Sequence, residues 1–103
     1  ITEGVTVNES DIIDASKYII EKLNLIGPIT IQMIRAKSNN KLYIIEVNPR
    51  FGGGAPLSIK AGADIPLYIL KDYLGINNNV YYSHKRGIGM KRFFNEYFYE
   101  INN

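Results

Sequence analysis

The chain has 103 residues, of which 46% are hydrophobic and 21% charged, which excludes a disordered chain and allows one domain at most. Its net charge of +2 comes from scattered basic residues, which argues against nucleic-acid partners, and the absence of cysteine excludes disulfides and thiolate metal sites. Apolar runs are far shorter than the ~20 residues that cross a bilayer, so we expect a cytoplasmic protein with no membrane partner.

The first predicted element is a helix at about residues 10–24. Ser10 is suited to cap this helix, and Gly27-Pro28 stops the pattern because proline cannot donate to the helical hydrogen-bond ladder. One side of the helix carries residues at steps of four, three and four: Ile12, Ser16, Ile19 and Leu23. The pattern predicts an amphipathic helix that packs by one side.

The next predicted element is a β-hairpin. Residues 29–35 and 42–48 are rich in β-branched and aromatic side chains, and the polar residues 37–41 between them favour a tight turn. We expect a three-residue loop, Ser38–Asn40, because a two-residue turn without a bulge would put polar and apolar side chains on the wrong faces. The helix should cover one face of this hairpin.

The predicted register gathers polar side chains on one face of the hairpin. A three-residue loop places Gln32 directly opposite Glu46, and Asn48 shares their face because alternate residues of a strand point the same way. Tyr43, Ile45 and Val47 should form the apolar face. Carboxylate and amide oxygens suit Mg²⁺, although the same pattern also describes a solvated sheet face.

The second half of the chain reads as a glycine loop followed by helices. After Arg50, residues 51–56 contain three consecutive glycines, and short helices are expected at 57–61 and between Asp64 and Gly75. A turn follows at 77–79, and two short strands are favoured within 80–101. The expected fold class is α+β, with an antiparallel sheet and helices packed on one face.

The sequence from Ile45 to Leu67, I-E-V-N-P-R-F-G-G-G-A-P-L-S-I-K-A-G-A-D-I-P-L, preceded by G-P-I-T-I-Q at 27–32, resembles the C-terminal part of an ATP-grasp domain. The most similar subclass is the carbamoyl-phosphate synthase large-subunit type. There, glutamine, glutamate and asparagine at this spacing hold two magnesium ions that bridge the ATP phosphates. Gln32, Glu46 and Asn48 match that spacing, whereas many other ATP-grasp enzymes have an acidic residue in place of Gln32.

The resemblance implies an ATP-dependent ligase. A carboxylate or bicarbonate is activated as an acyl-phosphate and passed to an amine or a similar nucleophile. The cofactors implied are ATP and Mg²⁺, with Mn²⁺ as a substitute. The resemblance assigns metal and cofactor binding to Gln32, Glu46 and Asn48, and contact with the acyl-phosphate or the substrate carboxylate to the catalytic Arg50, since a guanidinium bonds such oxygens bidentately.

We expect residues 1–103 to be a partial ATP-grasp domain, because the chain starts with isoleucine and the family's phosphate-contacting lysines and flap would lie upstream. The fragment alone should be inactive, with the missing N-terminal lobes, ATP and a carboxylate as partners of the full-length protein. The alternative is a non-catalytic regulatory or assembly domain that keeps the scaffold.

The remaining candidates have plainer interpretations. Asp64 reads as a helix cap rather than a base, and His84 as solvated surface rather than a ligand. The glycines at 52–54 suit either an anion cradle or a flexible loop, and Arg92 faces the shared pocket only if its segment is a strand. The aromatic residues 97–99 most simply pack the core, or in a truncated chain lie at the surface and favour a homodimer.

Overall fold

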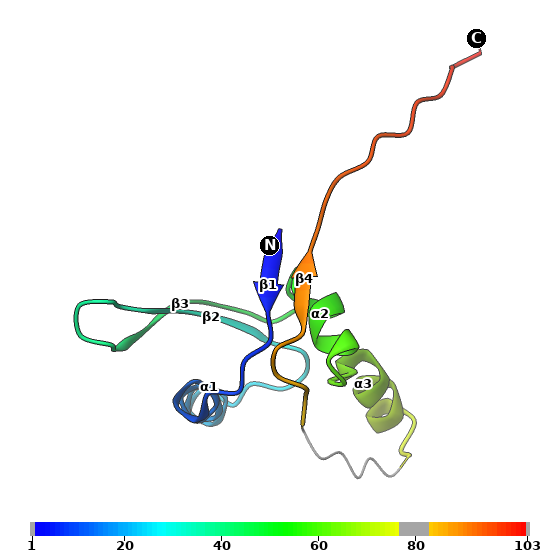
Figure 1. Cartoon of the computed structure of the whole chain (residues 1–103). Coiled ribbons are helices and arrows are strands. Elements are labelled where there is room, and N and C mark those ends of the chain that lie inside the picture. Colours follow the sequence, from blue (N-terminus) through cyan, green and yellow to red (C-terminus); the bar gives the residue numbers. More distant parts are fainter. Residues whose placement is uncertain (1, 77–82, 103) are drawn as a thin grey trace.

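The computed structural model describes residues 2–76 and 83–102, and Figure 1 shows a hairpin with one helix beside it and two short helices beyond its open end. The α+β class is therefore confirmed, with two separate two-stranded antiparallel sheets. The elements are β1 (Glu3–Val5), α1 (Ser10–Lys22), β2 (Thr30–Arg35), β3 (Leu42–Asn48), α2 (Ala55–Lys60), α3 (Ile65–Tyr73) and β4 (Gly89–Lys91).

The β2–β3 hairpin differs from the prediction at its turn. The Ala36 amide donates to the Lys41 carbonyl at 2.9 Å, so residues 37–40 form a four-residue loop rather than a three-residue one. Asn40 has a positive φ of 59°, a conformation that asparagine tolerates better than most residues. The loop is one residue longer than alternation suggested, which shifts the pairing at this end of the hairpin.

A β-bulge at Ile45 corrects this shift further along β3. Met33 pairs with Ile44 and Gln32 pairs with Glu46, which leaves Ile45 without an opposite residue. The prediction that Tyr43 shares a face with Val47 is therefore wrong, because Tyr43 pairs with Ile34, on the face of Gln32. An extra residue reverses the alternation on either side of it.

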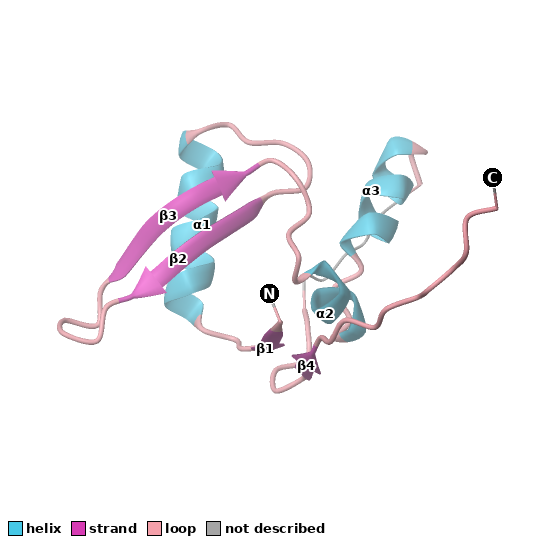
Figure 2. Ribbon diagram, turned by 90° about the horizontal axis from the view of Figure 1, so that it is seen from above, coloured by secondary structure: helices cyan, strands magenta, loops and turns pink. Residues whose placement is uncertain are grey.

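Helix α1 lies against one face of the hairpin (Figure 2). It begins one residue earlier than a Ser10 cap would require, because Glu9 occupies the N-cap position and Ser10 is already helical. Arg35, in the last position of β2, lies 2.8 Å from both the Glu9 and the Asp11 carboxylates. This contact ties the start of α1 to the hairpin.

Helix α3 begins where the sequence predicts. The Asp64 carboxylate accepts a hydrogen bond from the Leu67 amide at 3.2 Å, which confirms Asp64 as an N-cap. Gly75, just beyond the C-terminus of α3, has a positive φ of 68°. The turn expected at 77–79, and the start of the two strands expected after it, lie outside the described residues.

A second sheet joins the two ends of the chain, and the sequence reading missed it. Gly4 of β1 pairs with Met90 of β4, and the amides and carbonyls around Thr6 continue the contact to Gly87 and Ile88. Among the described residues, β4 is the one strand found within 80–101. The sequence therefore predicted a strand in this region but not β1, whose three residues are too few for alternation to reveal it.

The core is very small. Among the described residues, the buried hydrophobic ones are Ile19, which is 8% exposed, and Ala61, which is 3% exposed. The prediction that residues 97–99 pack the core is wrong, since their side chains are at least 72% exposed and the segment runs away from the body of the molecule (Figure 1). None of the described helices is long and apolar enough to cross a membrane.

Candidate functional site

The candidate site begins with a directly opposed pair on the hairpin. Gln32 of β2 lies opposite Glu46 of β3, as predicted, although the turn and the bulge were not. The longer loop shifts the pairing by one residue and the bulge at Ile45 shifts it back, so the two departures cancel at this position. Both side chains are exposed.

Asn48 completes the cluster through a side-chain hydrogen bond. Its Nδ2 donates to Glu46 Oε1 at 3.0 Å, which holds the carboxylate and leaves the Asn48 Oδ1 as an acceptor. Thr30, opposite Asn48, continues the same face of the hairpin. The structure thus brings together the three residues that the sequence singled out as oxygen donors.

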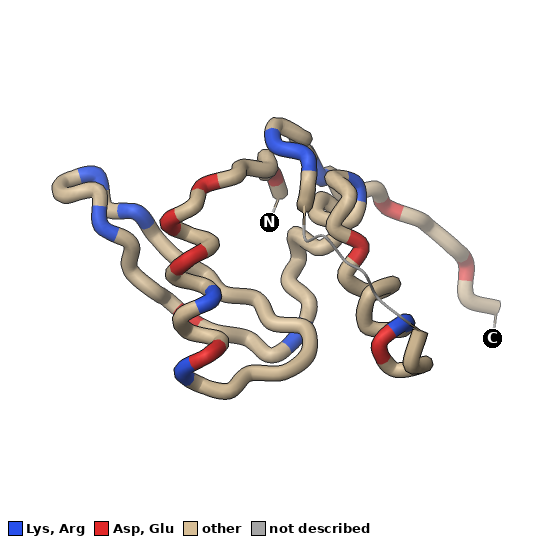
Figure 3. The backbone as a smooth tube through the Cα atoms, turned by 90° about the horizontal axis from the view of Figure 1, so that it is seen from below, with Lys and Arg blue, Asp and Glu red and all other residues tan. Residues whose placement is uncertain are grey.

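The cluster faces away from helix α1. Arg35 reaches the Asp11 carboxylate at the start of α1, so the side chains at alternate positions from Arg35 lie on the helix side. Gln32 is three residues from Arg35 and therefore lies on the opposite face. Figure 3 shows acidic residues along the chain leading into α1 and basic residues at the tip of the hairpin, away from this cluster.

Arg50 follows the cluster closely in the chain, but its side chain hydrogen-bonds the backbone of the next residue. The Arg50 amide donates to the Asn48 carbonyl at 2.8 Å, and Thr30 Oγ1 donates to the Arg50 carbonyl at 2.8 Å. Its guanidinium Nη1 donates to the Phe51 carbonyl at 2.9 Å. The backbone at Arg50 is thereby fixed against β2, and the exposed guanidinium lies along the glycine loop.

The glycine loop is held from both sides. A Cβ at Gly52 would lie 2.9 Å from Thr30 Oγ1 and Cγ2, so the backbone approaches β2 more closely than another residue would allow. On the other side, Arg92 Nη2 donates to the Gly53 carbonyl at 2.8 Å. Arg92 directly follows β4 and is not itself part of a strand, and its side chain lies against the loop.

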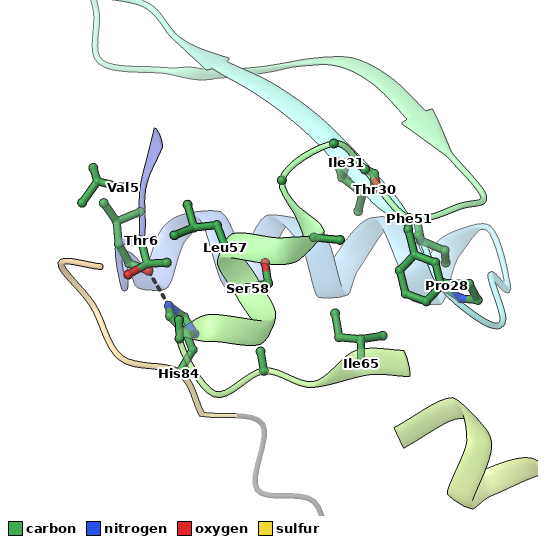
Figure 4. A pocket seen from close by; sticks show the side chains of 18 residues that line it. Val5, Thr6, Pro28, Thr30, Ile31, Phe51, Leu57, Ser58, Ile65 and His84 are labelled. Carbon is green, nitrogen blue, oxygen red and sulfur yellow. Dashed lines mark hydrogen bonds between the residues drawn. The ribbon is translucent and has the colours of Figure 1, made fainter. Parts of the chain in front are cut away.

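An open cavity of about 490 Å³ lies between the hairpin and the second half of the chain. Figure 4 shows side chains from β1, β2, the glycine loop and α2 around it. Its lining is mostly apolar and includes Val5, Ile31, Phe51, Leu57 and Ile65. Gln32, Glu46, Asn48 and Arg50 do not line it, so the polar cluster and the cavity are separate features.

His84 is the one residue of the cavity lining that the sequence reading placed wrongly. It was expected to be solvated surface, but it is half-buried and its Nε2 lies 2.6 Å from the Val7 carbonyl. A contact 77 residues apart in the chain leaves no trace in local sequence. The His84 ring therefore helps to hold the segment before β4 against the segment after β1.

The oxygen donors fit a hard divalent cation shared with a phosphate ligand. Glu46 supplies one carboxylate, and Gln32 and Asn48 supply amide oxygens, a set too weakly charged to enclose a cation alone. No group of three His, Cys, Asp or Glu residues that could hold a metal occurs in residues 2–76 and 83–102. Mg²⁺ characteristically takes few protein oxygens and completes its shell with nucleotide phosphates and water.

Comparison with known families identifies the family of the chain. Residues 2–94 match the family described as ATP-grasp in the biosynthetic pathway with Ter operon. Searches of the curated proteins and of the solved structures gave no significant match. The match spans nearly the whole chain and covers the paired strands, the glycine loop and β4, so this chain belongs to the ATP-grasp family, whose activity in general is that of an ATP-dependent ligase.

Proposed function

We propose that the protein uses Mg²⁺·ATP to activate a carboxylate or bicarbonate as an acyl-phosphate and passes it to an amine or a similar nucleophile, as carbamoyl-phosphate synthases do. In this proposal Gln32, Glu46 and Asn48 bind the cation, and Arg50 binds the acyl-phosphate. The ATP-grasp family match supports the ligase class. The carbamoyl-phosphate synthase type rests on the residues themselves.

The observation that carries the proposal is the Gln32–Glu46 pair. These residues are directly opposed, and Asn48 donates to Glu46 at 3.0 Å. The neighbouring bulge supports a functional role as well, because bulges are frequent beside active sites, where they redirect side chains. Gln32 at the position where many ATP-grasp enzymes have an acid favours the carbamoyl-phosphate synthase type within the family.

The chemistry follows from this donor set. A substrate carboxylate oxygen forms a bond to the γ-phosphorus of ATP, the bond from that phosphorus to the bridging oxygen breaks, and ADP leaves. The nucleophile then attacks the acyl carbon and inorganic phosphate departs. A bound cation would neutralise the phosphate oxygens during the transfer. Arg50 would orient the carboxylate, because a guanidinium donates two parallel hydrogen bonds to it.

The proposal is tested by ATP hydrolysis in the full-length protein, with bicarbonate and small carboxylates as candidate stimulants. Glu46→Ala should lower the stimulated rate by about a hundredfold or more, since the cation loses its one anionic protein ligand. Glu21→Ala, which removes an exposed carboxylate from α1, is the matched control and should leave the rate unchanged. Wild-type turnover in Glu46→Ala would remove Glu46 from the mechanism.

A binding measurement separates loss of the cation from loss of the fold. Mg²⁺ titrated into the chain, followed by the backbone amide resonances of residues 32, 46 and 48, should shift these resonances in the wild type and not in Glu46→Ala. Shifts restricted to distant residues would contradict the assignment of the metal ligands. Hydrolysis that no carboxylate stimulates would favour the non-catalytic scaffold instead.

A further inference from the structure

Arg92 links the second sheet to the glycine loop. It directly follows β4, and its backbone amide donates to the Thr2 carbonyl at 2.6 Å. Its half-buried side chain reaches the loop, where Nη2 donates to the Gly53 carbonyl at 2.8 Å. Figure 1 and Figure 2 both show β4 beside α2, the helix into which the loop leads. Because the guanidinium is charged, this hydrogen bond is stronger than one between two neutral groups.

Residues 51–54 of the loop depend on such contacts for a fixed conformation. Three of the four are glycines, whose backbone adopts more conformations than that of any other residue. Gly52 is fixed from the hairpin, since a Cβ there would lie 2.9 Å from the Thr30 side chain. Gly53 is exposed, and its own amide donates no hydrogen bond within the part of the chain that the structure describes. The hydrogen bond from Arg92 is therefore the contact that fixes Gly53.

The peptide groups of the loop are oriented through their carbonyls. Each of the four carbonyls accepts a hydrogen bond, from Arg50, from Arg92 or from a backbone amide at the start of α2. The amides of residues 51–54, by contrast, donate to no atom of residues 2–76 and 83–102. The N–H of a trans peptide points away from its C=O, so the contact from Arg92 also sets the direction of the Gly54 amide.

The same loop carries the side-chain contact of Arg50. Its guanidinium donates to the Phe51 carbonyl at 2.9 Å, two residues before the carbonyl that Arg92 holds. The two guanidinium groups thus contact alternate peptide groups of one glycine-rich segment. A turn of the backbone at Gly53 would displace the Phe51 carbonyl and release Arg50 from its present position.

We propose that Arg92 is a positioning residue of the ligase: it fixes the glycine loop at Gly53, and the loop in turn holds the Arg50 guanidinium where the substrate carboxylate or acyl-phosphate binds. The inference rests on the proposed function, in which Arg50 binds this group. A displacement of about 1 Å in a positioned group can lower a rate by about a hundredfold, so the rate should depend on this one hydrogen bond. The β1–β4 sheet then contributes to the reaction as well, because it carries Arg92 to the loop.

Steady-state kinetics of the full-length protein test this role, with stimulated ATP hydrolysis followed as the carboxylate concentration is varied. Arg92→Met should raise the KM for the carboxylate by about tenfold and leave the KM for ATP unchanged, because Arg50 binds the carboxylate. Arg92→Lys should recover part of the loss, since an ammonium group also donates to a carbonyl. Lys91→Met removes a neighbouring charge that is 82% exposed, and this matched control should keep both wild-type constants.

A double-mutant cycle distinguishes positioning from direct contact with the substrate. Arg50→Met should lower kcat/KM for the carboxylate by about a hundredfold, and adding Arg92→Met should lower it little further if Arg92 acts through Arg50. Losses that multiply would show an independent contact and overturn the proposal. A loss in Arg50→Met beside wild-type kinetics in Arg92→Met would overturn the positioning role alone. Wild-type kinetics in both would overturn the proposed role of Arg50 as well.

The loop itself gives a readout that does not require activity. In the wild-type chain the backbone amides of residues 52–54 should have NMR order parameters near the roughly 0.85 of rigid backbone, and in Arg92→Met these should fall to about 0.6 or below. Gly4 and Met90, which pair in β1 and β4, should keep their wild-type values. An unchanged loop, or an equal loss of order in the strands, would overturn the proposal, because Arg92 would then not hold the loop or would only support the sheet.

Discussion

The side chain of Thr30 in β2 contacts both the Arg50 backbone and the glycine loop. Its Oγ1 donates to the Arg50 carbonyl at 2.8 Å, and its side chain fills the space where a Cβ of Gly52 would lie. Its backbone pairs with Asn48 of the oxygen cluster. The position of the glycine loop relative to the cluster therefore depends on how closely residue 52 approaches this threonine.

Gly52→Ala should accordingly destabilise the protein by about 1–3 kcal/mol, as overpacked sites do, because the new methyl group would lie 2.9 Å from the Thr30 side chain. Urea unfolding monitored by circular dichroism measures the change. Gly89→Ala is the control, since its Cβ would meet its nearest neighbour at 4.0 Å. Thr30→Ser should recover part of the loss in Gly52→Ala, and an unchanged stability of Gly52→Ala would contradict the close approach.

The sequence alone predicted that Gln32, Glu46 and Asn48 lie close together, because strand alternation and hairpin pairing depend on residues near one another in the chain. It was not sufficient to find the direction of the Arg50 guanidinium, which depends on the nearby Phe51 carbonyl. The hydrogen bond from Arg92 to Gly53 was also out of reach, because 39 residues separate the partners. Side-chain direction at the end of a strand is decided by such contacts rather than by residue type.

At the scale of elements, the hairpin and α1 are coupled through Arg35. The guanidinium hydrogen-bonds the Asp11 carboxylate at 2.8 Å, and this contact lowers the pKa of Asp11 below its ordinary value. The unfolded chain binds this proton more readily than the folded one. The stabilisation is therefore fully present above the ordinary pKa of 3.8 and is lost as the pH falls through the lowered value.

Asp11→Asn should flatten the dependence of unfolding free energy on pH over the acid range, without a large change near neutrality, because the pair is exposed to solvent. Denaturant unfolding measures the slope of the unfolding free energy against pH, from neutral pH down to pH values at which Asp11 is protonated. Arg35→Met should flatten the curve as well, and the double variant should flatten it no further than the stronger single change. A wild-type slope in Asp11→Asn would contradict the coupling.

The hairpin also shows where pattern reading fails at this scale. Alternation predicted the apolar set Tyr43, Ile45 and Val47, but the extra residue at Ile45 moves Tyr43 to the face of Gln32. A bulge leaves no distinct signature where consecutive residues are all β-branched or aromatic, as at Tyr43, Ile44 and Ile45. The four-residue loop was equally hidden, because residues 37–41 are all polar and suit several turn lengths.

At the scale of the whole molecule, the ends of the chain are joined around Thr6. Its Oγ1 donates to the Lys85 carbonyl at 2.6 Å and accepts from the Ile88 amide at 3.0 Å. His84 adds a contact to the Val7 carbonyl. These contacts hold β1 beside β4, and β4 in turn delivers Arg92 to the glycine loop. Pairings of this span depend on tertiary structure, so the sequence reading did not find them.

Thr6→Val keeps the shape of the side chain and removes both hydrogen bonds of its hydroxyl. We expect a loss of about 1–3 kcal/mol, since the Ile88 amide and the Lys85 carbonyl lose their partner. Amide hydrogen exchange at Gly4 and Met90 should accelerate, which reports on the strand pair directly. Thr2→Val, an exposed change in the same segment, is the control. Unchanged protection in Thr6→Val would show that β1 and β4 are held by their backbone alone.

The small core has a thermodynamic consequence. Because Ile19 and Ala61 are the only buried hydrophobic residues among those described, few apolar groups remain to be hydrated when the chain unfolds. The heat-capacity increment should then fall below the roughly 1.2–1.5 kcal/mol/K of an ordinary domain of 100 residues. The denaturant m-value should be low for the same reason. We therefore expect thermal unfolding of this chain to extend over a wide temperature range. A sharp unfolding transition would require another surface to cover its exposed apolar side chains.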